Sequence, residues 1–585
     1  MGDIINLRQA RKSKKRVEGE RKAEANRLKH GRTKADNRLA EMDKQRNNAV
    51  IDGARRELLV KDTLAHWQPT TTIPLLNCTL GDALRRSAAR FPMRRALAWA
   101  EGDGLAELTY AQMLTEAGQI ACWLLERAEP GDRIAVWSRN TVEWALLEFG
   151  CALTGMVVAA WNPGWTDFEC EHARDLTTPA LVLAGHDTRG TSLMKRACAI
   201  AGPESFFPLD DLRNLARGSQ MRDLPQVAPS DLFLIQFTSG TTGRAKGAAL
   251  SHRTVVNGAW LRTQACRADE SDVWVNPSPL SHMGGSVTLL PGAIITGACY
   301  GIMNRFDPVE FLRLIRLAEA TRIGGVPTML LAMLEHPDWQ PGSVSLRSVG
   351  SGGAQVPQVL IERLMREFAA PVLVSYAQSE CPIITSSTPG DDPHLLAETV
   401  GRCAPHVELK VIDPVSGATV RHGEKGEICV RGPMVMQGYY RMPEASAATI
   451  DGQGYLHTGD LGTLDAEGFV RIDGRLRDVI IRGGENIYPA EVEGALLLHP
   501  DISEVAVVGV ADQRWGQQVA AAVLCRDRMC PTAEQLEHHT AARLAHFKVP
   551  KIWKFVDALP MTPNGKVSKV AVEQMFAAME LRKTS

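Results

Sequence analysis

The sequence lacks the cysteine patterns that mark several common protein classes. Its twelve cysteines are scattered, and none forms a CxxC pair. The usual signatures of structural zinc sites and of thioredoxin-like chemistry are therefore missing. Scattered thiols in a large chain are more typical of a reducing compartment than of a disulfide framework.

Long apolar runs are missing too. The longest, 146–161 and 287–303, are interrupted by Gly, Thr or Pro, and neither reaches the roughly 20 apolar residues that span a bilayer. The first residues are rich in Lys and Arg and lack the apolar core of a signal peptide. By elimination, we expect a cytoplasmic location.

The chain has almost no net charge, -1 by formal count, but its charges are unevenly distributed. Residues 1–56 carry 17 Lys and Arg against 8 Asp and Glu, a net of +9, which leaves about -10 on the rest. With few large apolar residues to bury, segment 1–57 is expected to be a solvated helix or a disordered extension. A basic arm for nucleic acid or an anionic membrane is the alternative. The segment faintly resembles a family of short uncharacterised bacterial proteins, which implies no activity.

From about Leu58 the pattern becomes that of an α/β protein. Helical periodicity, as in 110–126, alternates with short apolar strands such as 133–137, which predicts parallel or mixed sheets. Strands become denser from Glu427, and a short α+β pattern follows Gly474. We predict a large N-terminal domain with a β-rich subdomain, 58–475, and a small mobile C-terminal domain, 476–585.

One loop has the composition of a phosphate-binding site. The apolar strand 232–237 runs into a segment dense in Gly, Ser and Thr that ends in Lys. Its glycines permit positive φ, its backbone N–H groups can form an anion nest, and the lysine adds a mobile charge. It is not a Walker A loop, because Ala245 stands where the second glycine is needed. The predicted phosphate-binding residues are Thr238, Ser239, Gly240, Thr241, Thr242, Gly243 and Lys246.

This loop resembles the signature loop of the adenylate-forming superfamily, which includes acyl-CoA synthetases, luciferases and the adenylation domains of peptide synthetases. The segment Ser-Tyr-Ala-Gln-Ser-Glu at 375–380 is similar to the YGxTE segment of that superfamily. The resemblance implies that Tyr376 stacks on adenine, that Ser379 contacts the α-phosphate, and that Glu380 holds Mg²⁺ together with Thr238. A carboxylate oxygen suits such a hard cation.

Two further segments resemble the parts of the superfamily that bind the nucleoside. Gly353 and Ala354 follow strand 347–350 and resemble the adenine shelf. His457-Thr458-Gly459-Asp460 resembles the ribose-binding motif, which implies that Asp460 accepts hydrogen bonds from both ribose hydroxyls. Arg475 is implied to bind ribose or phosphate.

The C-terminal part resembles the CoA ligases. Segment 474–493 is similar to their hinge and thioester-forming loop, with Arg477 at the hinge position, where Lys or Asp is commoner. The segment 560–566 resembles their C-terminal lysine motif, which implies that Lys566 bridges the substrate carboxylate and the α-phosphate. The residues implied to contact CoA are Gly483, Gly484, Glu485 and Asn486.

The acyl group is the least defined part of the prediction. Pro279–Gly285 resembles the substrate-side motif, which makes His282 a pocket candidate beside Trp274 and Met283. These side chains suggest a hydrophobic acid. Medium- or long-chain fatty, alicyclic, sterol-derived and aryl acids all stay open.

Together the motifs predict an AMP-forming acyl-CoA ligase that uses ATP, CoA and Mg²⁺. Its predicted catalytic residues are Lys566, Thr238, Glu380 and Lys246. Transfer of the acyl group to a carrier protein or another acceptor is one alternative, and a non-catalytic binding protein with a basic recruiting arm is another. We expect no nucleic acid partner; peripheral membrane contact and the oligomeric state, including a homodimer, stay open.

The composition of the extension leads to a first prediction. Because segment 1–57 has little to bury, a chain that begins at Leu58 should keep its turnover and its affinity for each substrate. Steady-state kinetics of the two chains, with folding checked by circular dichroism, test this. A folded truncation with a large loss of turnover would show that the extension takes part in catalysis.

Overall fold

The computed structural model divides the chain into two units, Met1–Leu64 and Ala65–Ser585. It describes residues 14–22, 63–187, 189–220, 222–238, 244–483, 485–512, 514–526, 530–562 and 567–583. In the first unit, residues 14–22 are helical, and Arg16 and Glu20 form an exposed ion pair one turn apart. No described helix is both long and apolar enough to cross a membrane.

A six-stranded sheet carries the predicted phosphate loop. Its strands are parallel except for the last pair, β8 and β9, which form an antiparallel hairpin. The central strands are short and buried on both faces, as expected for a parallel sheet covered by helices. In order, the strands are β7 (Phe206–Pro208), β6 (Leu181–Ala184), β4 (Arg133–Trp137), β5 (Val157–Trp161), β8 (Leu232–Thr238) and β9 (Lys246–Ser251).

A nine-stranded mixed sheet carries the predicted nucleoside-binding residues. Six central strands are parallel, and antiparallel strands stand at both edges. In order, they are β16 (Arg402–Cys403), β15 (Cys381–Ser386), β14 (Val372–Gln378), β13 (Ser348–Gly352), β12 (Arg322–Gly325), β10 (Val273–Asn276), β11 (Cys299–Ile302), β2 (Arg95–Glu101) and β3 (Gly104–Thr109).

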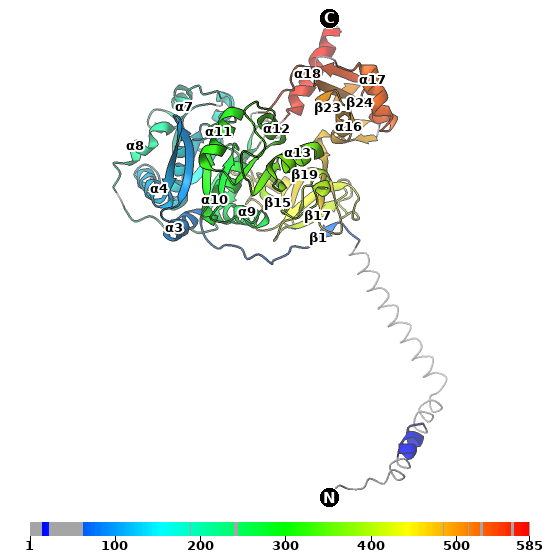
Figure 1. Ribbon diagram of the computed structural model, residues 1–585, viewed down its shortest axis with the longest axis horizontal. Helices are drawn as coiled ribbons and strands as arrows, with labels where there is room; N and C mark the ends of the chain where they lie inside the picture. Colours follow the sequence, from blue (N-terminus) through cyan, green and yellow to red (C-terminus); the bar gives the residue numbers. More distant parts are fainter. Residues whose placement is uncertain are drawn as a thin grey trace. The chain divides into compact units, whose positions relative to one another are not determined.

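The two sheets share one hydrophobic core. Alternate residues of β5 enter different cores: Val158 and Ala160 face the shared one, whereas Ala159 and Trp161 face an outer one. In the nine-stranded sheet, too, some residues face the shared core, whereas others face a second outer core. The α-helices that contribute buried residues to the shared core (blue to green in Figure 1) are α3 (Leu80–Arg90), α4 (Tyr110–Leu125), α5 (Val142–Thr154), α8 (Leu212–Ala216), α9 (His252–Ala265) and α10 (Leu290–Thr296).

The outer faces of both sheets are covered by further helices. Amphipathic patterns with one buried face recur in them, as in α13, where Leu360, Ile361, Leu364 and Phe368 are buried. On the six-stranded sheet these are α6 (Asp167–Thr177) and α7 (Met194–Ala201). On the nine-stranded sheet they are α11 (Pro308–Ala318), α12 (Pro327–Leu334), α13 (Gln358–Phe368) and α14 (Pro393–Glu398).

The predicted β-rich subdomain is an antiparallel five-stranded sheet. Strand β1, near the start of the second unit, pairs with β17, more than 300 residues later in the chain. Helix α15 (Pro443–Thr449) lies in the connection between two of the strands. In order, the strands are β1 (His66–Trp67), β17 (Glu408–Ile412), β18 (Gly426–Arg431), β19 (Leu456–Leu464) and β20 (Val470–Arg475).

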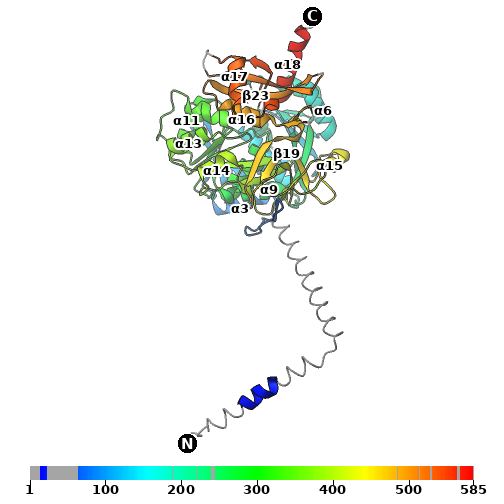
Figure 2. The ribbon, with the colours of Figure 1, turned by 90° about the vertical axis from the view of Figure 1, so that its right-hand side faces the viewer.

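The C-terminal elements form a small α+β sheet of their own, which is the pattern expected after Gly474. Odd-numbered residues of β24, such as Val519, Ala521 and Val523, pack under α16 and α17, whereas Ala520 and Ala522 pack under α18. These helices therefore lie on opposite faces of the sheet (orange and red in Figures 1 and 2). The elements are β21 (Ile480–Arg482), β22 (Glu485–Ile487), β23 (Ile502–Asp512), β24 (Gly516–Cys525), β25 (Ile552–Phe555), α16 (Pro489–Leu497), α17 (Ala533–Ala541) and α18 (Lys569–Lys583). The predicted fold class is confirmed.

One expectation about the cysteines needs correction. Ten of them are free thiols, but Cys525 and Cys530 form a disulfide at the end of β24. Their spacing of five residues fits no CxxC pattern, so the sequence carried no signal for the pair.

A buried charge cluster joins the starts of three neighbouring strands of the nine-stranded sheet. The carboxylate of Asp272, whose side chain is fully buried, lies 2.8 Å from Arg322 Nε and 3.0 Å from Arg347 Nη1. Arg322 also donates to the hydroxyl of Ser348. These residues stand at the start of β10, β12 and β13, so the cluster links three adjacent strands, the last of which leads to the predicted adenine shelf.

This cluster gives a prediction about stability. Asp272→Ala leaves the buried Arg322 without its main counter-charge, and should destabilise the protein by about 3–5 kcal/mol. As a control, Glu398→Ala removes the exposed partner of Arg471 and should cost at most about 1 kcal/mol. Denaturant unfolding followed by tryptophan fluorescence compares the two midpoints. Equal midpoints would mean that the buried cluster does not stabilise the sheet.

Candidate active site

The predicted phosphate loop connects the two strands of a hairpin. Thr238 and Lys246 are register partners on β8 and β9, and so stand on either side of the loop's mouth. This hairpin explains why an apolar strand precedes the loop, and it places Lys246 at the start of the returning strand. The predicted residues Ser239, Gly240, Thr241, Thr242 and Gly243 lie outside the described residues.

The phosphate-loop lysine and the predicted magnesium ligand share one tyrosine. Lys246 Nζ lies 4.8 Å from the centroid of the Tyr439 ring. The Tyr439 hydroxyl donates a hydrogen bond of 2.7 Å to Glu380 Oε1. Burial, and next the charge of Glu380, raises the pKa of Tyr439 well above its usual value, so the phenol remains a donor. Lys246 and Glu380, 134 positions apart in the sequence, thus contact different parts of Tyr439, the ring and the hydroxyl.

Tyr439 was not predicted from the sequence. It stands in a Gly-Tyr-Tyr segment whose backbone pairs with β9: Ala249 N–H donates to Gly438 O, and Tyr440 N–H donates to Gly247 O. The segment is held beside the phosphate loop by these bonds rather than by a motif. An aromatic pair after a glycine was the only signal, and it carries no chemistry by itself.

Glu380 offers one carboxylate oxygen to a cation. Its Oε1 accepts from Tyr439, whereas Oε2 and the Thr238 hydroxyl have no hydrogen-bond partner among the described residues. The carboxylate is half-buried and its backbone carbonyl is held by Met436 N–H at 2.8 Å. An oriented carboxylate with a free oxygen and a threonine hydroxyl are ligand types that Mg²⁺ accepts.

The predicted ribose carboxylate is held from two sheets. Asp460 is buried, and its Oδ2 accepts hydrogen bonds of 2.6 Å from both Tyr376 Oη and Gln378 Nε2. Arg475 Nε lies 3.2 Å from its other oxygen, Oδ1, and Arg475 is its register partner on β20. Burial, and next the charge of Asp460, raises the pKa of Tyr376 well above its usual value. The structure therefore brings together three of the residues predicted from the sequence, Tyr376, Asp460 and Arg475.

Gln378 is a second residue that the motifs did not single out. It lies inside the segment 375–380, but nothing in the sequence showed that its amide reaches Asp460. It also donates to the carbonyl of Thr458 at 3.0 Å, and so contacts the ribose motif twice.

The ribose loop is tied down at three points. Gly459 has a φ of +67°, a conformation that favours glycine, and its N–H donates to Glu427 Oε1 at 3.1 Å. The Thr458 hydroxyl donates to Ile428 O at 2.7 Å and accepts from Asp460 N–H at 3.1 Å. These contacts place the Asp460 carboxylate before any ligand binds.

The predicted adenine shelf lies directly beside Tyr376. Gly352 pairs in register with Ser375, and a Cβ at Gly352 would stand 2.9 Å from the Ser375 carbonyl oxygen. Gly353 has a φ of +78°. Both positions thus favour glycine, and the backbone without side chains that they leave, with Ala354 after it, adjoins the strand of the tyrosine that is predicted to stack.

The acyl-pocket candidates divide into two groups. Trp274 and Met283 are buried in the shared core, whereas His282 is half-buried. His282 Nδ1 accepts from Gly284 N–H at 3.2 Å, at the start of η2 (Gly284–Leu289). A Cβ at Gly285 would stand 2.4 Å from the Pro279 carbonyl oxygen, so this turn also requires glycine.

The hinge and the start of the CoA loop are well defined. Arg477 lies in the short helix η3 (Leu476–Asp478), with its exposed guanidinium 3.4 Å from Asp478 Oδ1. Gly483 has a φ of +61°, and a Cβ there would stand 2.8 Å from the Trp515 ring. Glu485 opens β22. Gly484, the side chain of Asn486 and Lys566 lie outside the described residues.

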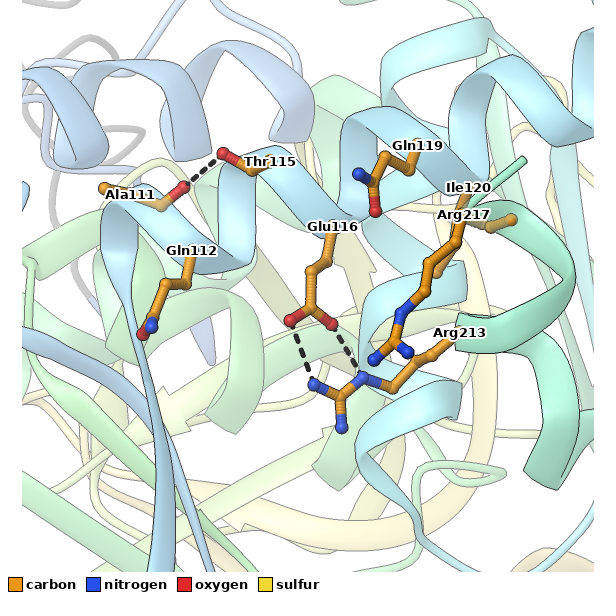
Figure 3. Close-up of a pocket in the computed structure, with 9 residues that line it drawn as sticks. Ala111, Gln112, Thr115, Glu116, Gln119, Ile120, Arg213 and Arg217 are labelled. Atoms are coloured by element: carbon orange, nitrogen blue, oxygen red, sulfur yellow. Dashed lines mark hydrogen bonds and ion pairs between the residues drawn. The ribbon is translucent and has the colours of Figure 1, made fainter. Parts of the chain in front are cut away.

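One described cavity lies away from these residues. It has a volume of about 460 Å³ and lies between α4 and α8 (Leu212–Ala216), where Arg213 binds both carboxylate oxygens of Glu116 at 2.7 and 2.9 Å (Figure 3). None of the predicted site residues lines it. We therefore assign no part of the active site to this cavity.

Comparisons with known proteins agree with this geometry. Residues 84–440 match the AMP-binding enzyme model, 491–566 match the AMP-binding enzyme C-terminal domain, and 2–56 match a domain of unknown function. The chain belongs to the AMP-binding enzyme family.

The chain is similar along most of its length to named acyl-CoA ligases. It is 31% identical to the putative acyl-CoA synthetase YngI of Bacillus subtilis, over 86% of this chain and 98% of the relative. It is 34% identical to the 3-[(3aS,4S,7aS)-7a-methyl-1,5-dioxo-octahydro-1H-inden-4-yl]propanoyl:CoA ligase of Rhodococcus jostii, again over 86% and 98%. Among solved structures, ATP-bound MatB from Rhodopseudomonas palustris matches with a TM-score of 0.79 and 29% identity, over 86% and 99%.

The link through Tyr439 gives a prediction about magnesium. Tyr439→Phe keeps the ring beside Lys246 but removes the donor that orients Glu380, and should raise the Mg²⁺ concentration needed for half-maximal adenylation roughly tenfold or more. Glu380→Gln should raise it further, because it removes the charge. Tyr440→Phe, next in the chain, is the control. Magnesium titrations of diphosphate release test this, and unchanged titrations would leave Glu380 with a structural role only.

Proposed function

We propose that this chain is an AMP-forming acyl-CoA ligase, which joins a carboxylic acid to AMP and then passes the acyl group to CoA. The observation that carries the proposal is the carboxylate of Asp460, held by Tyr376, Gln378 and Arg475 beside the glycine shelf. A buried carboxylate with fixed donors is suited to a vicinal diol. Family membership and the similarity to named CoA ligases support the same reaction.

The first half-reaction makes a good leaving group. A free carboxylate resists attack by a thiol, because the leaving group would be oxide. One oxygen of the carboxylate therefore attacks the α-phosphorus of ATP in line, and the bond to diphosphate breaks. The product is an acyl-adenylate, a mixed anhydride. In such transfers the protein mainly positions the reactants and stabilises charge.

The cations divide that task. Lys246, at the mouth of the phosphate loop, contributes charge near the phosphates, and Lys566 would bridge the substrate carboxylate and the α-phosphate. Mg²⁺, which Thr238 and Glu380 would hold, neutralises phosphate charge when bound. The Tyr439 hydroxyl keeps the Glu380 carboxylate oriented.

The second half-reaction exchanges AMP for CoA. The CoA thiolate attacks the acyl carbon, the bond to the AMP oxygen breaks, and the thioester and AMP form. We propose that the small domain turns about Arg477 between the halves, removing Lys566 and presenting Gly483–Asn486. The tight approach of Gly483 to Trp515 supports a loop whose backbone, rather than its side chains, faces the pantetheine arm. A few residues that absorb a large backbone change are the usual form of a hinge.

The acid that we propose is hydrophobic. Its pocket would begin at His282, because Trp274 and Met283 are packed into the core and His282 is the partly accessible member of the three. The similar Rhodococcus jostii ligase is named for a bicyclic propanoate, and another relative, human ACSF2, is named as a medium-chain acyl-CoA ligase. We propose a cytoplasmic location.

Diphosphate release measured with and without CoA separates a CoA ligase from an enzyme that uses another acceptor.

If one active site catalyses both half-reactions by presenting two faces of the small domain in turn, a substitution on one face should slow only the half-reaction that this face serves. Lys566→Ala removes a charge needed during attack on ATP, and should slow acyl-AMP formation by roughly 100- to 1000-fold. It should still convert supplied acyl-AMP and CoA to thioester at a near-native rate. Gly484→Leu should do the reverse, because a side chain would block the thiol. Arg477→Pro fixes φ at the hinge, and should spare the first half but stall the second.

Each half-reaction is measured separately in the three variants by rapid quench. Lys551→Ala, which removes an exposed partner of Glu537 in the same domain, is the control and should leave both rates unchanged. If Lys566→Ala slows both halves equally, or Gly484→Leu loses adenylation first, the two-face mechanism is wrong.

A further inference from the structure

Three side chains of metal-ligand type converge on neighbouring strands of the five-stranded sheet. They are Glu427 and Cys429 on β18 and His457 on β19, and one ligand atom of each lies within 4.8 Å of the others. Cys429 and His457 are register partners, and Glu427, two residues before Cys429, projects from the same face. Glu427 and Cys429 are buried, whereas the His457 side chain is 31% exposed. The cluster is therefore closed by protein on one side and open at the histidine.

The distances fit a tetrahedral transition-metal ion. With a metal–sulfur bond of about 2.3 Å and a metal–nitrogen bond of about 2.0–2.1 Å, a tetrahedral angle puts the two ligand atoms about 3.5–3.6 Å apart. Cys429 Sγ and His457 Nδ1 are 3.6 Å apart. An oxygen and a nitrogen ligand should be about 3.3 Å apart by the same reasoning, and Glu427 Oε2 lies 2.9 Å from Nδ1. To bind the ion, Glu427 Oε2 must move only about 0.4 Å away from His457 Nδ1, and a small rotation of the glutamate side chain is enough for that.

Two acidic or amide groups beside the cluster fit the second layer of a metal site. Asp451 Oδ2 lies 3.7 Å from the other ring nitrogen of His457, on the side away from the cluster. A carboxylate behind a ligating histidine is the usual outer partner in metal sites. Glu427 uses its second oxygen, Oε1, to accept from Gly459 N–H at 3.1 Å, which leaves Oε2 for the ion. Glu427 is thus oriented by a hydrogen bond that an ion would not have to break, and Asp451 lies near the ring nitrogen of His457 that the ion would not use.

We propose that Glu427, Cys429 and His457 bind one borderline transition-metal ion such as Zn²⁺, with water as the fourth ligand on the exposed side of His457. A donor set of one sulfur, one imidazole nitrogen and one carboxylate oxygen suits Zn²⁺ or Co²⁺ rather than Mg²⁺. The site is separate from the residues proposed to hold the magnesium that accompanies ATP. The ion would tie β18 to β19 three residues before Asp460, so its role would be to hold the ribose loop, not to take part in the chemistry.

The test uses cobalt as a spectroscopic probe on the full chain. Protein dialysed against a chelator is titrated with Co²⁺, and a thiolate-to-cobalt charge-transfer band should grow until one ion is bound per chain. Added Zn²⁺ should remove the band by displacing the cobalt. If no saturable band appears, or if it saturates far from one equivalent, the proposal is wrong.

Variants locate the ion. Cys429→Ser should abolish the charge-transfer band, and Glu427→Gln should keep the band but weaken cobalt binding at least tenfold. Cys198→Ser, which changes a half-buried thiol of α7, is the matched control and should bind as the parent does. A band that persists in Cys429→Ser, or that is lost in Cys198→Ser, overturns the assignment. If Cys429→Ser does not fold, as judged by circular dichroism, the Glu427→Gln affinity decides: an unchanged value overturns the proposal.

Discussion

The nucleotide site depends on one buried negative charge. Asp460 belongs to the five-stranded sheet, yet two of the groups that bind it, Tyr376 and Gln378, belong to the nine-stranded sheet. A buried carboxylate is costly unless it is paired and hydrogen-bonded, so the two sheets must meet where these donors reach it. The same contacts hold the carboxylate where the proposed ribose hydroxyls would bind. Stability of the interface and organisation of the site therefore have a common cause.

A similar arrangement organises the phosphate side. The β8–β9 hairpin presents Lys246, the turn between β14 and β15 presents Glu380, and Tyr439 contacts both. One aromatic side chain thus keeps a cation and an anion at fixed places without letting them pair with each other. This matters because a lysine bound to Glu380 would compete with Mg²⁺ for the carboxylate. Tyr439 gives both groups a neutral partner and leaves one carboxylate oxygen open.

The proposed metal cluster lies behind the ribose loop and shows how strand pairing creates a site. Cys429 and His457 are 28 residues apart and meet because β18 and β19 pair in register. The missing CxxC pattern argued against structural zinc at the level of sequence, because that pattern needs ligands close together in the chain. Cross-strand ligands leave no such local pattern.

The sequence by itself determined the fold class, the class of chemistry and most of the proposed site. Dense local motifs do this well, because the loop after β8, the segment around Tyr376 and the glycine-rich segment at Gly483 each carry their residues within a few positions. The α/β pattern was equally local, since apolar runs such as Arg133–Trp137 form strands and the helical pattern predicted for 110–126 forms the helix Tyr110–Leu125. Only the tertiary structure decided which residues support these motifs. Gln378 donates to the carboxylate of Asp460, 82 positions away in the chain, and Tyr439 donates to the carboxylate of Glu380, 59 positions away. It likewise put Trp274 and Met283 in the core and closed the Cys525–Cys530 disulfide. The physical reason is that these contacts depend on how sheets and strands pack together, and packing between distant segments leaves no periodicity or spacing in the chain.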